Sequence, residues 1–276
     1  MKHAEGELRT AAGAALYFQS WLPTGAPRAA LLIAHGLAEH SGRYAHFADF
    51  FVERGYAVFA LDHIGHGKSE GERCHIGRFS EYTDGVSLLL ERIRDACPDT
   101  DAFLVGHSMG GLIAAVHLLE RQNDFAGCIV SGAAVKATEE PPWMQLLLLR
   151  FFSKVFPRLR VLQLDASQVS RDPDVVDRYR DDPLVFSGKV TARLAEQLFA
   201  AMAALESRLD SIELPMLILH GSKDGLTLPE GSKMLHDKIS SHDRELIIYD
   251  GLYHEVYNEP EQEAVMTDVA NWLAVR

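Results

Sequence analysis

Short apolar runs alternate along the chain with stretches whose apolar residues recur every three to four positions. Such runs are typical of buried strands, and the longer period is typical of amphipathic helices. The runs fall at residues 29–34, 57–61, 103–105, 128–130, 216–219 and 246–249, after a more polar opening strand at 15–20. Because strands of a parallel sheet are buried on both faces and joined by helices, the alternation predicts an α/β fold with a mostly parallel central sheet covered by helices on both faces.

Two helices between these strands have visible limits. Three phenylalanines recur at helical spacing ahead of Gly55, a residue type that commonly follows the end of a helix. Residues 80–96 carry a longer pattern of the same kind, and Pro98 lies just beyond it. We therefore expect one helix to end before Gly55 and another to occupy residues 80–96.

The alternation stops between residues 134 and 209, where the sequence is helical in pattern and interrupted by prolines. An insertion of this length between strands of one sheet predicts a cap rather than a loop. We therefore expect a core formed by residues 1–133 and 210–276, with an inserted helical cap formed by residues 134–209.

The first predicted helix of the cap, residues 143–152, has more apolar positions than one buried stripe needs. It is too short to span a bilayer. The helix either packs onto the core below it, or roofs an apolar pocket or contacts a lipid surface. Different faces of one helix can serve these purposes together.

The segment Gly106-His107-Ser108-Met109-Gly110 lies between a predicted strand and a predicted helix. A sharp strand-to-helix turn holds a serine rigid and exposed, and its crowded backbone favours glycine on both sides. The N-terminus of the following helix also directs N–H groups toward an anion that forms there. This context predicts that Ser108 is a nucleophile.

A nucleophilic serine on such a sheet needs an acid and then a histidine, each just past a later strand. Asp224 follows the 216–219 strand, and His254 is the only histidine after the last strand. Asp210 and Asp250 are the alternatives for the acid. Asp210 precedes the strand, and Asp250 lies four residues from the histidine that it would orient.

The oxyanion of an acyl transfer needs two backbone donors near the serine. The loop after an early strand gives one donor, and the residue after the nucleophile gives the other. These positions are Leu37, next to Gly36, and Met109. We expect the N–H groups of Leu37 and Met109 to form the oxyanion hole.

The segment from Asp62 to Gly67 gathers a carboxylate and two histidines, which allows a metal-site interpretation. Metal ligands usually come from several elements or from one helix face, whereas glycines alternate through this segment. We interpret it as a tight loop that supports the rim of the site, and we expect no metal.

Composition narrows the class of protein without identifying a reaction. The chain has 276 residues, of which 47% are hydrophobic and 24% charged, as expected for a soluble globular protein. The net charge of −12 opposes binding to nucleic acid or anionic membranes. Three widely spaced cysteines indicate free thiols in a reducing compartment, and the first residues form no apolar leader, so we expect a cytoplasmic protein.

Three further stretches carry a recognisable pattern: HGLAEHSGRY at 35–44, DHIGHGKSEG at 62–71, and a cap segment with Ser170-Arg171 and then residues 179–184. Together with residues 106–111 they resemble the monoglyceride lipases, in the lysophospholipase-like branch of the α/β-hydrolase superfamily. The resemblance covers nearly the whole chain. It implies an α/β-hydrolase fold with an inserted cap, and hydrolysis of a single-acyl glyceride ester without a cofactor.

The resemblance also implies which residues hold the glycerol end of the substrate. Glu39, Arg43, His107 and Tyr179 are the candidates carried over from it. Glu39 and Arg43 have an alternative role as a purely structural ion pair. The implied partner is a small lipid ester, and we expect the cap to contact a lipid interface transiently and to remain at most peripheral to the membrane.

Several other functions fit parts of this pattern. A broader carboxylesterase or a lysophospholipase would share the fold and the same three catalytic residues. Enzymes of this fold that use a carboxylate nucleophile do not fit, because Ser108 stands in the nucleophile position. A non-catalytic lipid-binding module is the alternative outside enzymes, and such a module would normally have lost a member of the triad.

Overall fold

The computed structural model describes residues 2–137 and 142–276. Eight strands form one sheet in the order β1-β2-β4-β3-β5-β6-β9-β10. Neighbours from β4 to β10 are parallel, and β2 is antiparallel to both β1 and β4. This confirms the predicted mostly parallel sheet. The strand bounds are β1 Lys2–Arg9, β2 Ala15–Leu22, β3 Ala30–Ala34, β4 Ala57–Leu61, β5 Ala102–His107, β6 Gly127–Ser131, β9 Met216–Gly221 and β10 Arg244–Tyr249.

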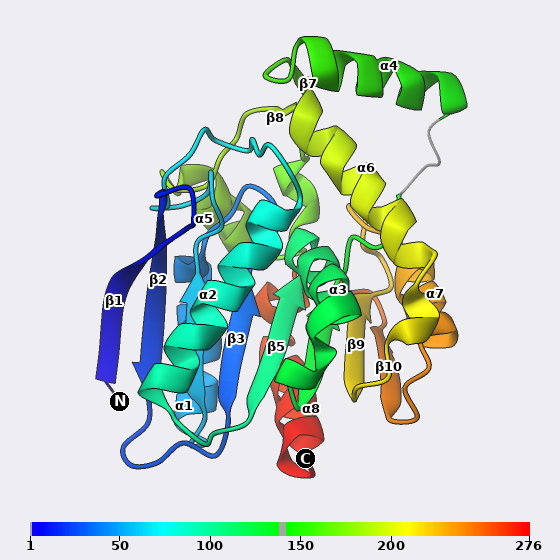
Figure 1. Cartoon of the computed structure of the whole chain (residues 1–276). Coiled ribbons are helices and arrows are strands. Elements are labelled where there is room, and N and C mark those ends of the chain that lie inside the picture. The colour runs from blue at the N-terminus through cyan, green and yellow to red at the C-terminus, as the bar shows by residue number, and fades with distance from the viewer. Residues whose placement is uncertain (1, 138–141) are drawn as a thin grey trace.

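Side chains of the central strands alternate between two hydrophobic cores, one on each face of the sheet. In β3, Ala30 and Leu32 belong to one core, and Leu31 and Ile33 belong to the other. The first core is covered by α2 (Ser80–Ala96), α3 (Met109–Arg121) and α7 (Pro229–Lys238); the second is covered by α1 (Ala45–Val52) and α8 (Gln262–Ala274) (Figure 1). Burial on both faces explains why the strands are continuous apolar runs.

The two predicted helix limits are confirmed. Helix α2 occupies residues 80–96 and buries one stripe that includes Tyr82, Val86 and Leu89. Helix α1 ends at Val52, and Gly55 follows with φ of +85°, a conformation that glycine adopts without strain.

The segment between β6 and β9 lies over the carboxyl end of the sheet, at the top of Figure 1. Its described α-helices and strands are α4 (Trp143–Val155), β7 (Arg160–Leu162), α5 (Pro173–Asp181), β8 (Val190–Thr191) and α6 (Ala192–Glu206), and two short 3₁₀ helices lie at Ala166–Gln168 and Leu209–Ser211. Side-chain caps start its later helices: Asp172 accepts from Asp174 N, and Thr191 accepts from Leu194 N. Residues 138–141 of the predicted cap lie outside the described residues.

Helix α4 packs against α6 but leaves a broad apolar face exposed. Leu146, Leu149 and Phe152 are half-buried, and Ser153 is the only fully buried residue of the helix. We call the exposed set the outer face of α4; it consists of Trp143, Met144, Leu147, Leu148, Phe151 and Val155. No helix of the described residues combines the length and hydrophobicity that a membrane crossing requires.

Candidate active site

Ser108 lies in the turn between β5 and α3, with φ of 54° and ψ of −118°. Its N–H donates to the carbonyl of Ser131 at 2.9 Å, and its carbonyl accepts from Ala134 N at 3.0 Å. A side chain at Gly110 would collide with the carbonyl of Ala34, and one at Gly106 would lie 2.5 Å from the carbonyl oxygen of Gly110. The glycines therefore permit a strained turn that neighbouring strands hold in place.

His254 and Asp224 are joined by a hydrogen bond of 2.7 Å between Nδ1 and Oδ2. An ionised carboxylate only accepts, so Nδ1 carries the proton and Nε2 is left unprotonated as a base. Burial alone would lower the pKa of His254, but the charge and hydrogen bond of Asp224 outweigh it and raise that pKa above its usual value. The pair has the chemistry of an oriented general base.

Asp224 is held by several donors besides His254. Its Oδ1 accepts from the N–H groups of Leu226 at 2.8 Å and Thr227 at 2.9 Å. Its Oδ2 accepts from Thr227 Oγ1 at 2.8 Å and lies 3.1 Å from Nε2 of the buried His220. Burial would raise the pKa of Asp224, but the charge of His254 and these hydrogen bonds hold it well below its usual range. The carboxylate therefore stays ionised and fixed in place.

The two alternative acids lie elsewhere. Asp250 is exposed and accepts a hydrogen bond from Ser222 at 3.1 Å, and Asp210 is exposed in a short 3₁₀ helix before β9. Of the three carboxylates, Asp224 is the one that contacts His254.

The loop after β3 lies directly against the serine turn. A Cβ at Gly36 would be 3.2 Å from Ser108 Cβ, so the loop backbone approaches closely because residue 36 is glycine. The N–H of Gly36 donates to Glu39 Oε1 at 2.6 Å, which ties the loop back on itself. Leu37 and Met109 both line the same cavity as Ser108.

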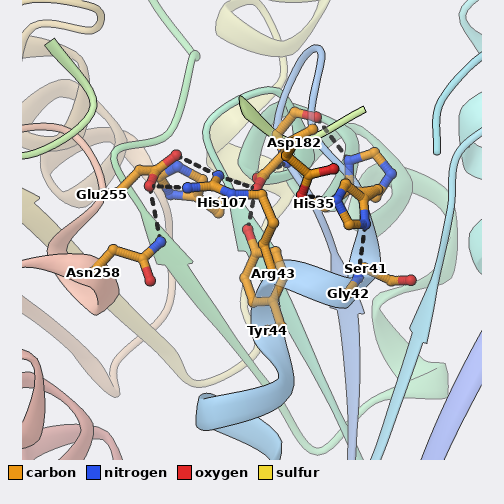
Figure 2. Close-up of polar contacts among 12 residues, drawn as sticks. His35, Ser41, Gly42, Arg43, Tyr44, His107, Asp182, Glu255 and Asn258 are labelled. Atoms are coloured by element: carbon orange, nitrogen blue, oxygen red, sulfur yellow. Dashed lines mark hydrogen bonds and ion pairs between the residues drawn. The ribbon is translucent and has the colours of Figure 1, made fainter. Parts of the chain in front are cut away.

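A buried charged cluster joins this loop to the loop that carries His254 (Figure 2). Arg43 Nη1 donates to Glu39 Oε2 and to Glu255 Oε1, both at 2.6 Å, and Nη2 donates to Glu255 Oε2 at 2.6 Å. Asn258 donates to Glu255 at 2.8 Å, and the Arg43 guanidinium lies 4.6 Å from the ring centre of Tyr179. The structure thus contains the Glu39–Arg43 ion pair that was one of the two interpretations, with Glu255 as a second partner.

Ionisation in the cluster follows from the pairing. Burial would raise the pKa of Glu39, but the charge of Arg43 outweighs it and lowers that pKa below its usual value.

His107 lies next to the cluster with its ring centre 4.7 Å from that of His254. Burial lowers the pKa of His107 to about 4, and the nearby charge of His254 acts in the same direction. His107 is therefore neutral at physiological pH.

A cavity of about 970 Å³ opens between the carboxyl end of the sheet and the segment that joins β6 to β9. Seven of the predicted site residues line it: Leu37, Glu39, His107, Ser108, Met109, Tyr179 and His254. The two others lie behind this lining, Asp224 behind His254 and Arg43 behind the carboxylates of Glu39 and Glu255. Most of the remaining lining is apolar and comes from the segment between β6 and β9: Ala134, Ala137, Pro142, Leu162, Leu164, Val169, Ala195, Leu198, Phe199 and Met202.

Sequence reasoning missed Glu255, His220 and Thr227 as parts of the site. Glu255 carried a usable signal, since it follows His254 directly. Thr227 and His220 lie three and four residues from Asp224 in sequence. This spacing does not show whether their side chains bond to the Asp224 carboxylate or are only buried structural residues.

The segment from Asp62 to Gly67 forms a loop that is hydrogen-bonded to the segment after β3. The two carboxylate oxygens of Asp62 accept from Ser41 N and Lys68 N, each at 2.7 Å, so the carboxylate closes the loop. The N–H of His63 donates to His35 Nε2 at 3.0 Å, next to the loop that holds Leu37.

Comparison with known proteins gives a family model and several similar proteins. The family model described as serine aminopeptidase, S33, matches residues 25–261. The monoacylglycerol lipase of Mycolicibacterium smegmatis is 38% identical over 261 residues, which cover 95% of this chain and 93% of that protein. The monoglyceride lipase of Homo sapiens is 35% identical over 272 residues, covering 98% of this chain and 90% of that protein. The crystal structure of Paleococcus ferrophilus monoacylglycerol lipase is similar with a TM-score of 0.84 and 31% identity, covering 94% of this chain and 98% of that one.

Proposed function

The chain belongs to the serine aminopeptidase S33 family of α/β-hydrolases, and we propose that it is a serine hydrolase that cleaves monoacylglycerols to a fatty acid and glycerol. Full-length similarity to monoacylglycerol lipases supports this substrate class. The observation that carries the proposal is a cavity of about 970 Å³ with a largely apolar lining and with Ser108 and His254 in its wall.

The reaction runs through an acyl-enzyme. His254 Nε2 takes the proton of Ser108 as its oxygen attacks the ester carbonyl, and Asp224 stabilises the imidazolium that forms. The backbone N–H groups of Leu37 and Met109 bind the oxyanion. Glycerol leaves with the proton from His254, and water then repeats the sequence to release the fatty acid. No cofactor takes part in these steps.

The assignment of the base and acid is supported by the 2.7 Å hydrogen bond that fixes the His254 tautomer. The assignment of Leu37 and Met109 is supported by their position in the cavity wall beside Ser108. Glu39, His107 and Tyr179 are polar residues of that wall, which suits them to the glycerol end of the substrate.

Residues 134–209 act as the cap of this site in our proposal. Their described part contributes most of the apolar lining, and a roofed cavity accepts one acyl chain more readily than three. The outer face of α4 then remains available to contact the lipid interface in which monoacylglycerols are dispersed.

A hydrolysis panel tests the substrate class. It comprises mono-, di- and triacylglycerols, lysophospholipids and p-nitrophenyl esters over several chain lengths. We expect monoacylglycerols to exceed long-chain triacylglycerols by about 100-fold in rate, or ~2.7 kcal/mol in barrier. Equal rates on mono- and triacylglycerols would contradict the proposal and favour a broader esterase.

A further inference from the structure

The cavity has two chemically different halves. The apolar half comes mainly from the cap and suits an acyl chain. The other half holds Glu39, His107, Tyr179 and Glu255. These four lie together because Arg43 bonds to both glutamates and lies on the Tyr179 ring, and because His107 packs against His254, the neighbour of Glu255. Because the ester carbon must lie at Ser108, an acyl chain in the apolar half leaves the alcohol facing this polar half.

The polar half carries a net negative charge. Two buried carboxylates, Glu39 and Glu255, face a single cation, Arg43. Asp224 adds a further carboxylate behind His254. Among the described residues, the cationic side chain in the cavity wall is Lys136, which also lines the cleft between α4 and α6 and so belongs to the apolar half.

Arg43 is not available to an incoming anion. Its two terminal nitrogens donate three hydrogen bonds to the two carboxylates, and Tyr179 covers the guanidinium. Its side chain is 11% exposed and does not line the cavity. An anionic group in the polar half would therefore meet Glu39 and Glu255 without reaching the cation behind them.

We propose that the Glu39–Arg43–Glu255 cluster is a specificity device that excludes anionic alcohols, so that the enzyme takes esters of neutral glycerol and rejects esters of phosphorylated glycerol. This inference rests on the proposed function and narrows its substrate class. The physical basis is like-charge repulsion in a buried site, where desolvation removes the screening that water provides.

Three soluble substrates with the same short acyl chain separate charge from size. They are monodecanoylglycerol, decanoyl-lysophosphatidate and the dimethyl phosphotriester of that lysophosphatidate, which is larger but neutral. We expect kcat/KM for the lysophosphatidate to be at least about 30-fold below that for monodecanoylglycerol, because adjacent like charges cost several kcal/mol. The neutral triester should be turned over faster than the smaller anion.

Two charge-matched variants test whether the cluster is responsible. Glu255→Gln removes one carboxylate and leaves Glu39 and Arg43 as a neutral pair, so the net negative charge of the cluster is lost. The ratio of lysophosphatidate to monodecanoylglycerol turnover should then rise by about 10-fold. Glu259→Gln is the control, since Glu259 is a buried partner of Arg171 that does not line the cavity. It should leave the ratio unchanged. If Glu255→Gln fails to fold, Glu39→Gln replaces it, because this variant removes the other carboxylate that pairs with Arg43 and should raise the same ratio.

The outcomes distinguish this inference from the function on which it rests. Equal turnover of the lysophosphatidate and monodecanoylglycerol overturns the inference and leaves the proposed function standing. Turnover of the triester below that of the anionic lysophosphatidate would show that the size of the alcohol decides selectivity, and this too overturns the inference. An equal shift of the lysophosphatidate-to-monodecanoylglycerol ratio in Glu255→Gln and Glu259→Gln would overturn it as well. Failure to hydrolyse monodecanoylglycerol at all overturns the proposed function instead.

Discussion

Ser108 has a backbone conformation that glycine adopts more readily than any residue with a side chain. Such a conformation costs on the order of 1–3 kcal/mol and persists because the surroundings impose it. The strain should therefore be measurable as a difference in stability between two variants, one with glycine and one with alanine at residue 108.

Ser108→Gly should be more stable than Ser108→Ala, by about 1 kcal/mol, since glycine relieves the strain and alanine keeps it. Urea unfolding of the two variants measures this difference without any contribution from activity. Equal stability would mean that the turn imposes no strain on residue 108.

Asp224→Asn should lower kcat by about 10,000-fold with little change in thermal stability, because the amide can favour the wrong tautomer of His254. Asp250→Asn and Asp210→Asn are matched controls, and both should keep most of their activity, since neither carboxylate contacts His254. Loss of activity in Asp250→Asn with a functional Asp224→Asn would move the acid to residue 250.

The dependence of kcat/KM on pH should reflect the raised pKa of His254. The base works only when neutral, so kcat/KM should fall as the pH drops through a pKa above the ordinary value of about 6.5. We call this fall the acidic limb of the profile. In the residual activity of Asp224→Asn the acidic limb should move to lower pH, because the variant lacks the carboxylate charge that raises the pKa of His254. His107→Gln should leave the limb in place, since His107 is neutral throughout this range. An unmoved limb in Asp224→Asn would contradict the electrostatic pairing.

Only part of the charged cluster could be predicted from the sequence. Arg43 and Glu39 are four residues apart, so their pairing was one of the interpretations open from the sequence. Glu255 lies 212 residues from Arg43, and no periodicity connects the two. Only the meeting of the β3 and β10 loops at one sheet edge brings them together.

At the scale of elements, the strands buried on both faces were predictable because each is a continuous apolar run. β1 was not predicted: most of its residues are exposed, and it is held by pairing with β2 rather than by an apolar pattern. α8 buries Val265, Val269 and Trp272 at helical spacing, so its signal was present in the sequence and was not used. α7 buries mainly small residues, which give no such signal.

Helix α4 gives a prediction at this scale. Leu148→Ser and Phe151→Ser lie on its outer face and outside the cavity wall, so they should weaken binding to neutral vesicles while sparing turnover of soluble short-chain esters. Phe199→Ala changes the cavity wall and should instead impair long-chain substrates. Vesicle flotation and chain-length series measure the two effects. Unchanged vesicle binding in both outer-face variants would contradict contact with lipid through α4.

At the scale of the whole molecule, the order of the chain places the chemistry. The carboxyl ends of β3, β5, β9 and β10 meet at one edge of the sheet, and each is followed by one part of the site. For that reason a serine, an acid and a histidine far apart in sequence were predictable as a group. The shape of the cavity beside them was not, since it depends on how the segment between β6 and β9 packs over that edge.

The hydrolysis of a monoacylglycerol by wild type and by Ser108→Ala tests whether the protein cleaves this ester with Ser108 as the nucleophile. Wild type should hydrolyse the ester, and kcat/KM should fall by at least about 1000-fold in the variant, because the covalent step is lost while oxyanion and binding interactions remain. A folded Ser108→Ala protein that keeps near wild-type hydrolysis, or a wild type that does not cleave monoacylglycerols, would contradict the proposed function.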